Sequence, residues 1–173
     1  MNNLPISSAT YPLVPVLLGL SDRLSDALGI SVPQIVDMNQ LRSLPPGTFG
    51  RAWADSLDQQ GLKPLTSGPR RKQLHDGIHV LTGYGIDPLG EAEVQAFLLG
   101  AKFRLANVLL GLGLLHAVYR QSHAQTWEYS EQVWSRLFQA YLQGGRSTFD
   151  PDHWQPETLW EKPLAEVQAC FHL

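Results

Sequence analysis

Two histidines and two carboxylates are the residues of this 173-residue chain best placed to do chemistry: His75, Asp76, His79 and Glu91. On a helix, His75 and His79 would project about 40° apart around the axis, with Asp76 about 60° from His79. Glu91 can complete the group from a second segment. Imidazole nitrogens and carboxylate oxygens together suit Zn²⁺, Fe²⁺ or Mn²⁺, so the spacing predicts a divalent metal site. Paired histidines on a solvated helix face are the simpler alternative.

Three known metal-binding patterns can be compared with this spacing. The H-E-x-x-H pattern of zinc proteases has a Glu directly after its first His, where this chain has the shorter Asp76. The pattern of the HD phosphohydrolases needs a further His upstream, and none of the six histidines precedes His75. The pattern that fits is H-D-x-x-H, followed after eleven residues by a Glu.

The helix that carries this motif is predicted to begin after residues 67–69, with Ser67 as its N-cap. Arg70, Arg71 and Lys72 would then occupy its first turn, where positive charge opposes the helix dipole. An anion site beside the metal, for a phosphate, a carboxylate or a membrane surface, would account for that placement. A basic solvated turn accounts for it equally well. Arg70 and Arg71 are therefore candidate ligand-binding residues.

Glu91 is predicted to lie in the first turn of the next helix. Asp87 and Pro88 are typical of a cap and a first helical residue, and the turn at residues 83–88 can bring Glu91 back toward the histidines. Carboxylates are favoured in a first turn by the helix dipole. Glu91 would therefore also be an ordinary residue for a helix start.

Helical periodicity, with frequent cap and stop signals, predicts an all-α fold: a single compact domain of about six to eight helices over residues 1–173. Beyond the motif helix, we expect helices over 15–29, 31–44, 49–61, 88–104, 105–118, 127–143 and 157–171, the last bent at Pro163. Thr48 is expected to cap the third of these, burying Phe49, Ala52 and Trp53. The helix over 127–143 should turn Trp127, Val133, Trp134, Leu137, Phe138 and Tyr141 to its apolar side.

The stretch 105–118 is apolar on nearly every face. Only fifteen residues separate Arg104 from Arg120, fewer than the roughly 20 that a membrane-spanning helix needs. A helix of this kind is usually central and buried. Gly111 and Gly113 leave room either for another helix or for a prenyl chain against the backbone, which makes them candidate ligand-binding positions.

Composition narrows the functional class. A formal net charge of −3 and a pI near 6.0 argue against nucleic acid as a partner. One cysteine, Cys170, excludes an internal disulfide and is expected to pack in the last helix. No Lys or Arg precedes Arg23, which argues against a secretory signal or an Arg-rich transit peptide. We therefore expect a cytoplasmic, bacterial-type protein.

The H-D-x-x-H-(x)11-E motif and the segment PPGTFGRAWADSL at residues 45–57 resemble the coenzyme Q (ubiquinone) biosynthesis Coq-four family. The resemblance runs from Pro45 to the end of the chain. It is strongest at these two segments and weakest over 1–40 and 120–156.

The resemblance implies a protein of prenylated-quinone biosynthesis that binds a divalent metal, zinc above all, with Fe, Mn or Mg as other choices. It implies His75, Asp76, His79 and Glu91 as ligands. The implied activity removes the ring carboxylate of a prenylated benzoate precursor and hydroxylates that carbon. The implied partners are an isoprenoid lipid, a membrane surface bound peripherally and other enzymes of the pathway, with a homodimer left open.

Two other functions fit the same residues. Four protein ligands would close a tetrahedral site, as in structural metal centres, and the protein would then be a non-catalytic organiser that binds prenyl lipid. In the catalytic function, by contrast, Asp76 stays off the metal; a coordination position is then open, and Asp76 can act as a catalytic base.

The other alternative to the catalytic function is a metal-dependent hydrolase of prenyl phosphates.

Overall fold

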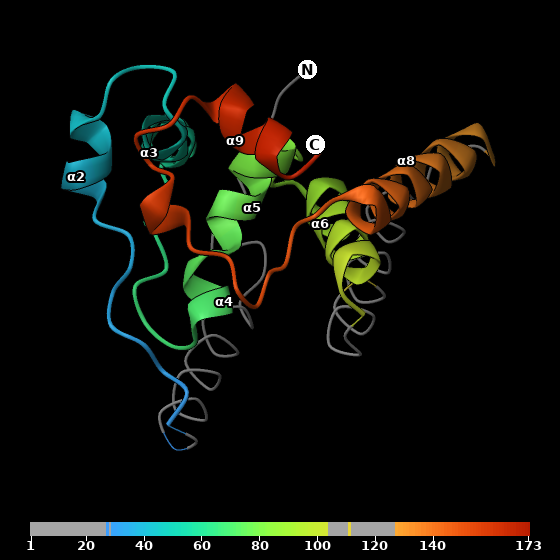
Figure 1. The fold of residues 1–173 in the computed structure, drawn as a ribbon. Helices are drawn as coiled ribbons and strands as arrows, with labels where there is room; N and C mark the ends of the chain where they lie inside the picture. Colours follow the sequence, from blue (N-terminus) through green and yellow to red (C-terminus); the bar gives the residue numbers. More distant parts are fainter. Residues whose placement is uncertain (1–26, 28, 104–110, 112–126) are drawn as a thin grey trace. The chain divides into compact units, whose positions relative to one another are not determined.

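The computed structural model describes residues 27, 29–103, 111 and 127–173 (Figure 1). Within these ranges the chain forms seven α-helices, one 3-10 helix and no strand, with an isolated bridge between Ser31 and Pro69. The predicted all-α class is confirmed. The elements are α2 Met38–Ser43, α3 Phe49–Gln60, α4 Arg70–Gln73, α5 His75–Thr82, α6 Pro88–Ala101, α8 Trp127–Arg146, the 3-10 helix Pro156–Thr158 and α9 Leu164–Cys170.

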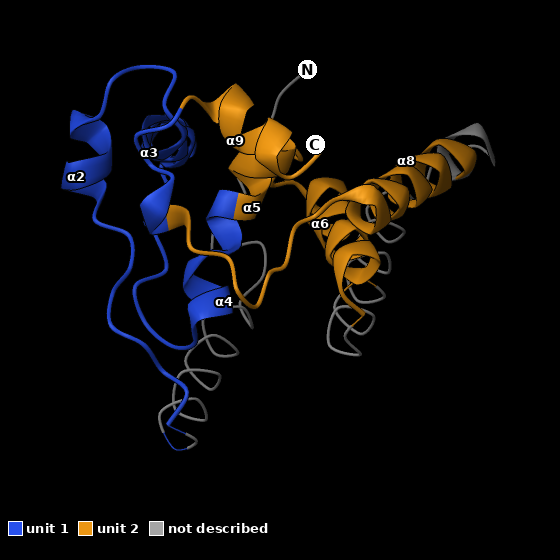
Figure 2. Ribbon diagram, in the orientation of Figure 1, with its two compact units in different colours: residues 1–77, 157–162 blue, residues 78–156, 163–173 orange. Residues whose placement is uncertain are grey.

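The chain divides into two compact units, shown in separate colours in Figure 2. One comprises residues 1–77 with 157–162, and the other comprises 78–156 with 163–173. The single-domain organisation over 1–173 stays a prediction. The helices expected over 15–29 and 105–118 lie, apart from residues 27, 29 and 111, outside the described residues.

In the first unit, α3 begins and ends where the sequence predicts, because a specific residue stops it at each end. Thr48 caps its N-terminus by accepting a hydrogen bond from the Arg51 amide, and Gly61 ends it in the left-handed region at φ 64°. Phe49, Trp53 and Leu57, spaced four apart, form its buried stripe. Ala52 is only half-buried because it lies beside that stripe.

The first turn of α3 also binds the returning C-terminal segment. The first four N–H groups of a helix have no partner within it, and here two of them are satisfied from residues 157–162. The Phe49 amide donates to the Lys162 carbonyl at 2.8 Å, and the Gly50 amide donates to that of Trp160 at 2.9 Å. This extended backbone explains why the last helix begins at Leu164 and not, as predicted, near Glu157.

The helix predicted over 31–44 begins only at Met38, so that prediction was wrong for its first half. Asp37 is its N-cap and accepts from the amides of Asn39 and Gln40. The preceding residues are extended because the buried side chain of Gln73 satisfies their backbone. Its Nε2 donates to the Val32, Pro33 and Gly68 carbonyls at 3.0, 3.4 and 3.3 Å, and its Oε1 accepts from the Ile35 amide at 3.0 Å.

Replacing Gln73 with leucine is expected to lower the free energy of unfolding by about 2–4 kcal/mol, since several buried backbone groups would lose their partner at once. Urea denaturation followed by circular dichroism measures it. Gln59→Leu, at an exposed position of α3, is the matched control and should change stability by under about 0.5 kcal/mol. Equal effects of the two substitutions would contradict the anchoring role of Gln73.

In the second unit, α6 and α8 cross at close range (Figure 1). Val133, Leu137 and Ala92 are buried between them. A Cβ atom at Gly144 would overlap the Phe97 carbonyl oxygen, and one at Gly100 would overlap that of Tyr141. Backbone thus lies against backbone at the crossing. The predicted end of α8 at residue 143 was wrong: the helix continues to Arg146, and the glycines within it allow the close approach to α6.

Only part of the predicted apolar side of α8 is buried. Val133 and Leu137 face α6, whereas Trp134, Phe138 and Tyr141 are 61%, 57% and 43% exposed. Those three aromatic side chains recur at helical spacing, so they form one exposed stripe, which we call the aromatic stripe of α8. Helical periodicity identifies an apolar face, but it does not reveal how much of that face a neighbouring element covers.

Two contacts within the second unit hold the C-terminal end of α9. The Gln168 side chain donates to the Leu81 carbonyl at 3.0 Å, and the Phe171 ring lies 5.4 Å from that of Phe149. Cys170 is exposed, so the prediction that it packs was wrong. Among the described helices, none combines the length and the apolar character needed to cross a membrane.

Candidate metal centre

The predicted motif helix is divided in two. The short α4 ends at Gln73, and α5 begins at His75. The N-cap of α4 is Pro69, with no side-chain cap bond, so the prediction of Ser67 was wrong. The break at Leu74 lets Gln73 point into the first unit as its anchor, while the four-residue spacing of His75 and His79 stays within one helix.

Gly77, between the two histidines, is required by close packing. A Cβ atom there would overlap the ring of Trp53, which is fully buried in α3. The sequence segment that carries the metal motif is therefore packed directly on the segment that carries Trp53. These are the two stretches on which the family resemblance depends.

His75, His79 and Glu91 form a group that can hold a metal ion. One ligand atom from each lies within 4.8 Å of those of the other two. His79 is 6% exposed, whereas His75 and Glu91 are half-buried. His79 Nε2 lies 3.3 Å from Glu91 Oε1. Two ligands of a tetrahedral ion with bonds of about 2.0–2.1 Å lie about 3.3–3.4 Å apart, so this separation fits a shared cation.

A backbone contact fixes how His79 presents its ring. His79 Nδ1 lies 3.2 Å from the Tyr84 carbonyl oxygen. A carbonyl only accepts, so Nδ1 carries the proton, and the lone pair of a neutral ring is on Nε2, facing Glu91. Metal-binding histidines usually donate their second nitrogen in this way. A doubly protonated His79 ring would instead form an ion pair with Glu91. A metal-binding measurement distinguishes the neutral ring, which can coordinate a metal, from the doubly protonated ring, which cannot.

The turn after α5 places the Tyr84 carbonyl under His79. Gly83, in the left-handed region at φ 76°, donates its amide to the His79 carbonyl at 2.8 Å. The Tyr84 amide then donates to Thr82 Oγ1 at 3.4 Å. Gly83 therefore ends the helix and reverses the chain beneath its last turn.

The start of α6 places Glu91 as predicted. Asp87 caps the helix by accepting from the Leu89 and Gly90 amides at 2.9 and 3.2 Å, and Pro88 is at its first position. Glu91 lies in the first turn and donates its amide to the Asp87 carbonyl at 2.9 Å. The favourable helix dipole and the contact with His79 therefore act on the same carboxylate.

The other predicted site residues are outside this group. Asp76 is half-buried on α5, and Arg70 forms a two-oxygen ion pair with Glu157 at 2.6–2.7 Å. Arg71 is half-buried on α4. A Cβ atom at Gly111 would lie 3.7 Å from that of Gln95. Gly113 is outside the described residues. The roles of these five residues stay predictions.

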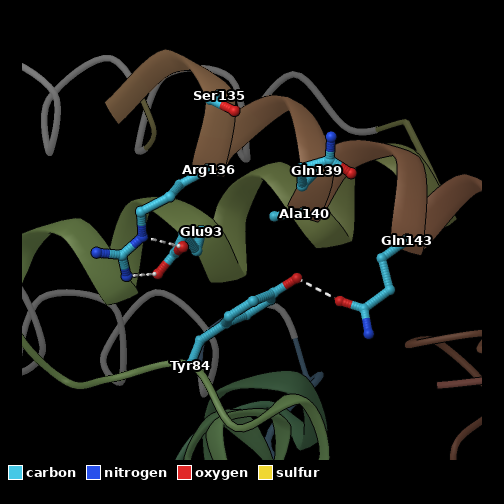
Figure 3. Close-up of a pocket in the computed structure, with 7 residues that line it drawn as sticks. All are labelled: Tyr84, Glu93, Ser135, Arg136, Gln139, Ala140 and Gln143. Atoms are coloured by element: carbon cyan, nitrogen blue, oxygen red, sulfur yellow. Dashed lines mark hydrogen bonds and ion pairs between the residues drawn. The ribbon is translucent and has the colours of Figure 1, made fainter. Parts of the chain in front are cut away.

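The structure also contains a cavity lined mostly by polar residues, which the sequence analysis missed. Its volume is about 340 Å³, and its lining residues are Tyr84, Glu93, Ser135, Arg136, Gln139, Ala140 and Gln143 (Figure 3). Glu93, 4% exposed, accepts two hydrogen bonds from Arg136 at 2.6–2.7 Å. A glutamate within the apolar run of α6 was the available signal, since buried carboxylates are almost always paired.

Tyr84 links this cavity to the metal group. Its hydroxyl donates to Gln143 Oε1 across the cavity (Figure 3). Burial, and secondarily the negative charge of Glu93, raise the pKa of Tyr84 to about 12. The hydroxyl is therefore a neutral hydrogen-bond donor throughout the physiological pH range.

The fold and the site together define an all-helical protein with a two-histidine, one-carboxylate candidate metal group. The sequence profile of the family described as coenzyme Q (ubiquinone) biosynthesis protein Coq4 matches residues 30–173. The chain therefore belongs to the Coq4 family, and the resemblance seen in the sequence is confirmed.

Individual relatives agree with this assignment. The chain is 26% identical to the mitochondrial ubiquinone biosynthesis protein COQ4 of Laccaria bicolor, covering 90% of this chain and 65% of the relative. It is 37% identical to the COQ4 homologue of Bos taurus over 76 residues, covering 36% and 29% of the two chains. The matched regions thus span less than two thirds of either relative. A crystal structure from Nostoc punctiforme has the same fold, with TM-score 0.66, 18% identity and coverage of 81% and 69%.

Proposed function

We propose that this protein uses a divalent metal to act on the ring of a prenylated benzoate precursor in ubiquinone biosynthesis, removing its carboxylate and hydroxylating that carbon. The observation that supports this most directly is the three-residue group of His75, His79 and Glu91. Catalytic metal sites typically use three protein ligands and leave a position for substrate or water, whereas structural sites are closed by four.

The identity of the metal decides where the oxidising power comes from. Replacing a ring carboxylate by a hydroxyl breaks a carbon–carbon bond, forms a carbon–oxygen bond and removes two electrons overall. With a redox metal such as iron at the site, O₂ would accept those two electrons and leave as hydrogen peroxide, with water balancing the added oxygen; a two-histidine, one-carboxylate set is typical of such iron sites. Zinc has no redox chemistry, so a zinc form would act by polarising the substrate and would need a separate oxidant.

The remaining residues of the motif have roles in this proposal. Asp76, next to His75 but outside the three-residue group, would serve as the base for a ring hydroxyl. Arg70 and Arg71 would receive the ring carboxylate, with Glu157 yielding its ion pair to Arg70 as substrate binds. The apolar residues 105–118, including Gly111 and Gly113, would lie along the prenyl chain.

The proposed setting is the cytoplasmic face of a membrane, where a prenylated precursor resides. Binding would be peripheral and shared with other enzymes of the pathway. Attraction of the basic residues 70–72 to an anionic surface would make it sensitive to salt. A high-salt wash that leaves the protein on the membrane would contradict the electrostatic part of this proposal.

The test is release of labelled CO₂. Protein purified without chelators is analysed for metal, then supplied with a prenylated hydroxybenzoate carrying ¹³C in its carboxyl group. We expect ¹³CO₂ and a ring product with one added hydroxyl, both abolished by a chelator and restored by one metal. The Asp76→Asn variant should keep its metal and lose at least about 100-fold in rate, the range for loss of a general base.

A non-catalytic organiser that binds prenyl lipid is the second candidate. The exposed aromatic stripe of α8, Trp134, Phe138 and Tyr141, favours it, because an apolar chain needs an apolar surface. The organiser would retain lipid with or without metal and would release no ¹³CO₂ with any metal. That result, with a fully metallated protein, would decide against the catalytic proposal.

A further inference from the structure

Tyr84 contacts two features within the second unit: the candidate ligand His79 and the cavity lined by residues of α6 and α8. Its main chain accepts the hydrogen bond from His79 Nδ1 at 3.2 Å. Its side chain lines the cavity and reaches α8 through Gln143, 59 positions later in the sequence (Figure 3). Neither contact follows from the metal motif itself.

The side chain of Tyr84 is held on two sides. Its ring lies edge-on to that of the fully buried Phe97, with centroids 6.4 Å apart at an interplanar angle of 66°. Its hydroxyl is bonded to Gln143, which is half-buried on α8. The cavity beside it is bordered by the Glu93–Arg136 ion pair, which joins α6 to α8. Tyr84 is thus fixed to both helices of the crossing.

The orientation of the His79 ring depends on where Tyr84 lies. The turn from Thr82 to Tyr84 is held locally by the Gly83 amide, by the Thr82 hydroxyl, which donates to the Ile78 carbonyl at 2.7 Å, and by a 3.4 Å bond from the Tyr84 amide. Beyond this turn, Tyr84 is held through its side chain, by the ring contact with Phe97 and the hydrogen bond to Gln143. The anchoring of the Tyr84 ring and hydroxyl therefore keeps its carbonyl beneath Nδ1 of His79.

We propose that Tyr84 is a positioning residue of the metal centre: its carbonyl selects the His79 tautomer whose lone pair is on Nε2, and its bond to Gln143 keeps that carbonyl in place. The inference rests on the proposed metal site. It extends the supporting shell of that site to α8, a helix that supplies none of the three candidate ligands.

The first measurement needs no metal. Long-range ¹H–¹⁵N spectra of the chelator-treated protein, recorded at a pH high enough to keep the His79 ring neutral beside Glu91, report which nitrogen of each histidine carries the proton. We expect His79, assigned by comparison with His79→Ala, to be protonated on Nδ1 in the wild type. In Tyr84→Phe and Gln143→Leu, which lose the bond across the cavity, we expect a mixture of tautomers. An unchanged His79 signal in both variants would overturn the proposal.

The second measurement is Co²⁺ affinity with its visible spectrum, in competition with Zn²⁺. Direct loss of an outer-shell partner typically costs 10–100-fold in metal affinity. Because these variants only loosen the partner, we expect about 3–10-fold weaker binding and shifted absorption bands. Tyr84→Phe and Gln143→Leu combined should be no worse than either alone, since both remove one bond.

Gln139→Leu is the matched control, because Gln139 lines the same cavity from the preceding turn of α8. It should leave tautomer, affinity and spectrum unchanged. Gln143→Glu keeps an acceptor for the Tyr84 hydroxyl and should restore wild-type values. Equal losses in Gln139→Leu and Gln143→Leu would overturn the proposal in favour of a general packing effect. Wild type that binds no Co²⁺ would instead refute the proposed metal function, while the tautomer spectra still decide the role of Tyr84.

Discussion

His75→Ala and His79→Ala are each expected to lose stoichiometric metal while keeping the helical fold. Loss of a ligand should weaken binding by more than the 10–100-fold typical of outer-shell changes. His79 should have the larger effect, because it is buried and already faces Glu91 at 3.3 Å. Metal per protein, measured by mass spectrometry after dialysis, gives the result, and far-UV circular dichroism checks the fold.

His153→Ala is the control for this experiment. It removes an imidazole from the surface, where His153 contacts Asp150 at 2.8 Å, and should leave the metal content at the wild-type value. Full occupancy in the His75→Ala, His79→Ala double variant would show that the metal binds elsewhere. The assignment of the motif as the metal centre would then be wrong.

Gly144→Ala is expected to lower the free energy of unfolding by about 2–4 kcal/mol, although alanine is the better helix former by about 1 kcal/mol. The new methyl group would overlap the Phe97 carbonyl oxygen, so α6 and α8 would have to separate. Val133 and Leu137 would lose part of their packing. A fall of about 5–15 °C in the melting temperature, measured by calorimetry, corresponds to this loss.

The neighbouring residue, Gly145, provides the matched control for this substitution. A Cβ atom there would lie 3.8 Å from the Gly100 carbonyl oxygen, which is ordinary contact, and the residue is exposed. Gly145→Ala should therefore be neutral or raise stability by up to about 1 kcal/mol. If both substitutions act alike, helix propensity and not the crossing determines stability here.

Features set by neighbouring residues were predictable from the sequence. The cap at Thr48, the left-handed end at Gly61 and the start of α6 at Asp87 and Pro88 depend on contacts within a few positions. Each is a local exchange between a side chain or a glycine and nearby backbone groups. For the same reason the sequence placed Glu91 correctly in the first turn of its helix.

Features set by distant residues were not predictable from one sequence. The extended backbone before α2 depends on Gln73, 41 positions after Val32, and the late start of α9 depends on bonds to α3. The same holds at the site. The four-residue spacing reveals His75 and His79, but the cavity depends on Glu93 pairing with Arg136, 43 positions away. Side-chain type alone does not show which partners meet.

The hydrogen bond from His79 to a main-chain carbonyl also has a consequence for how such metal centres diverge in evolution. Because the acceptor is backbone, a different side chain at position 84 can still offer the same oxygen, provided that it is anchored as Tyr84 is. The direction of that oxygen depends also on the residue before it, where Gly83 adopts φ 76°. Most other residues adopt that conformation only with strain. Among relatives, a non-glycine residue at this position should therefore mark a centre that holds its histidine by other means.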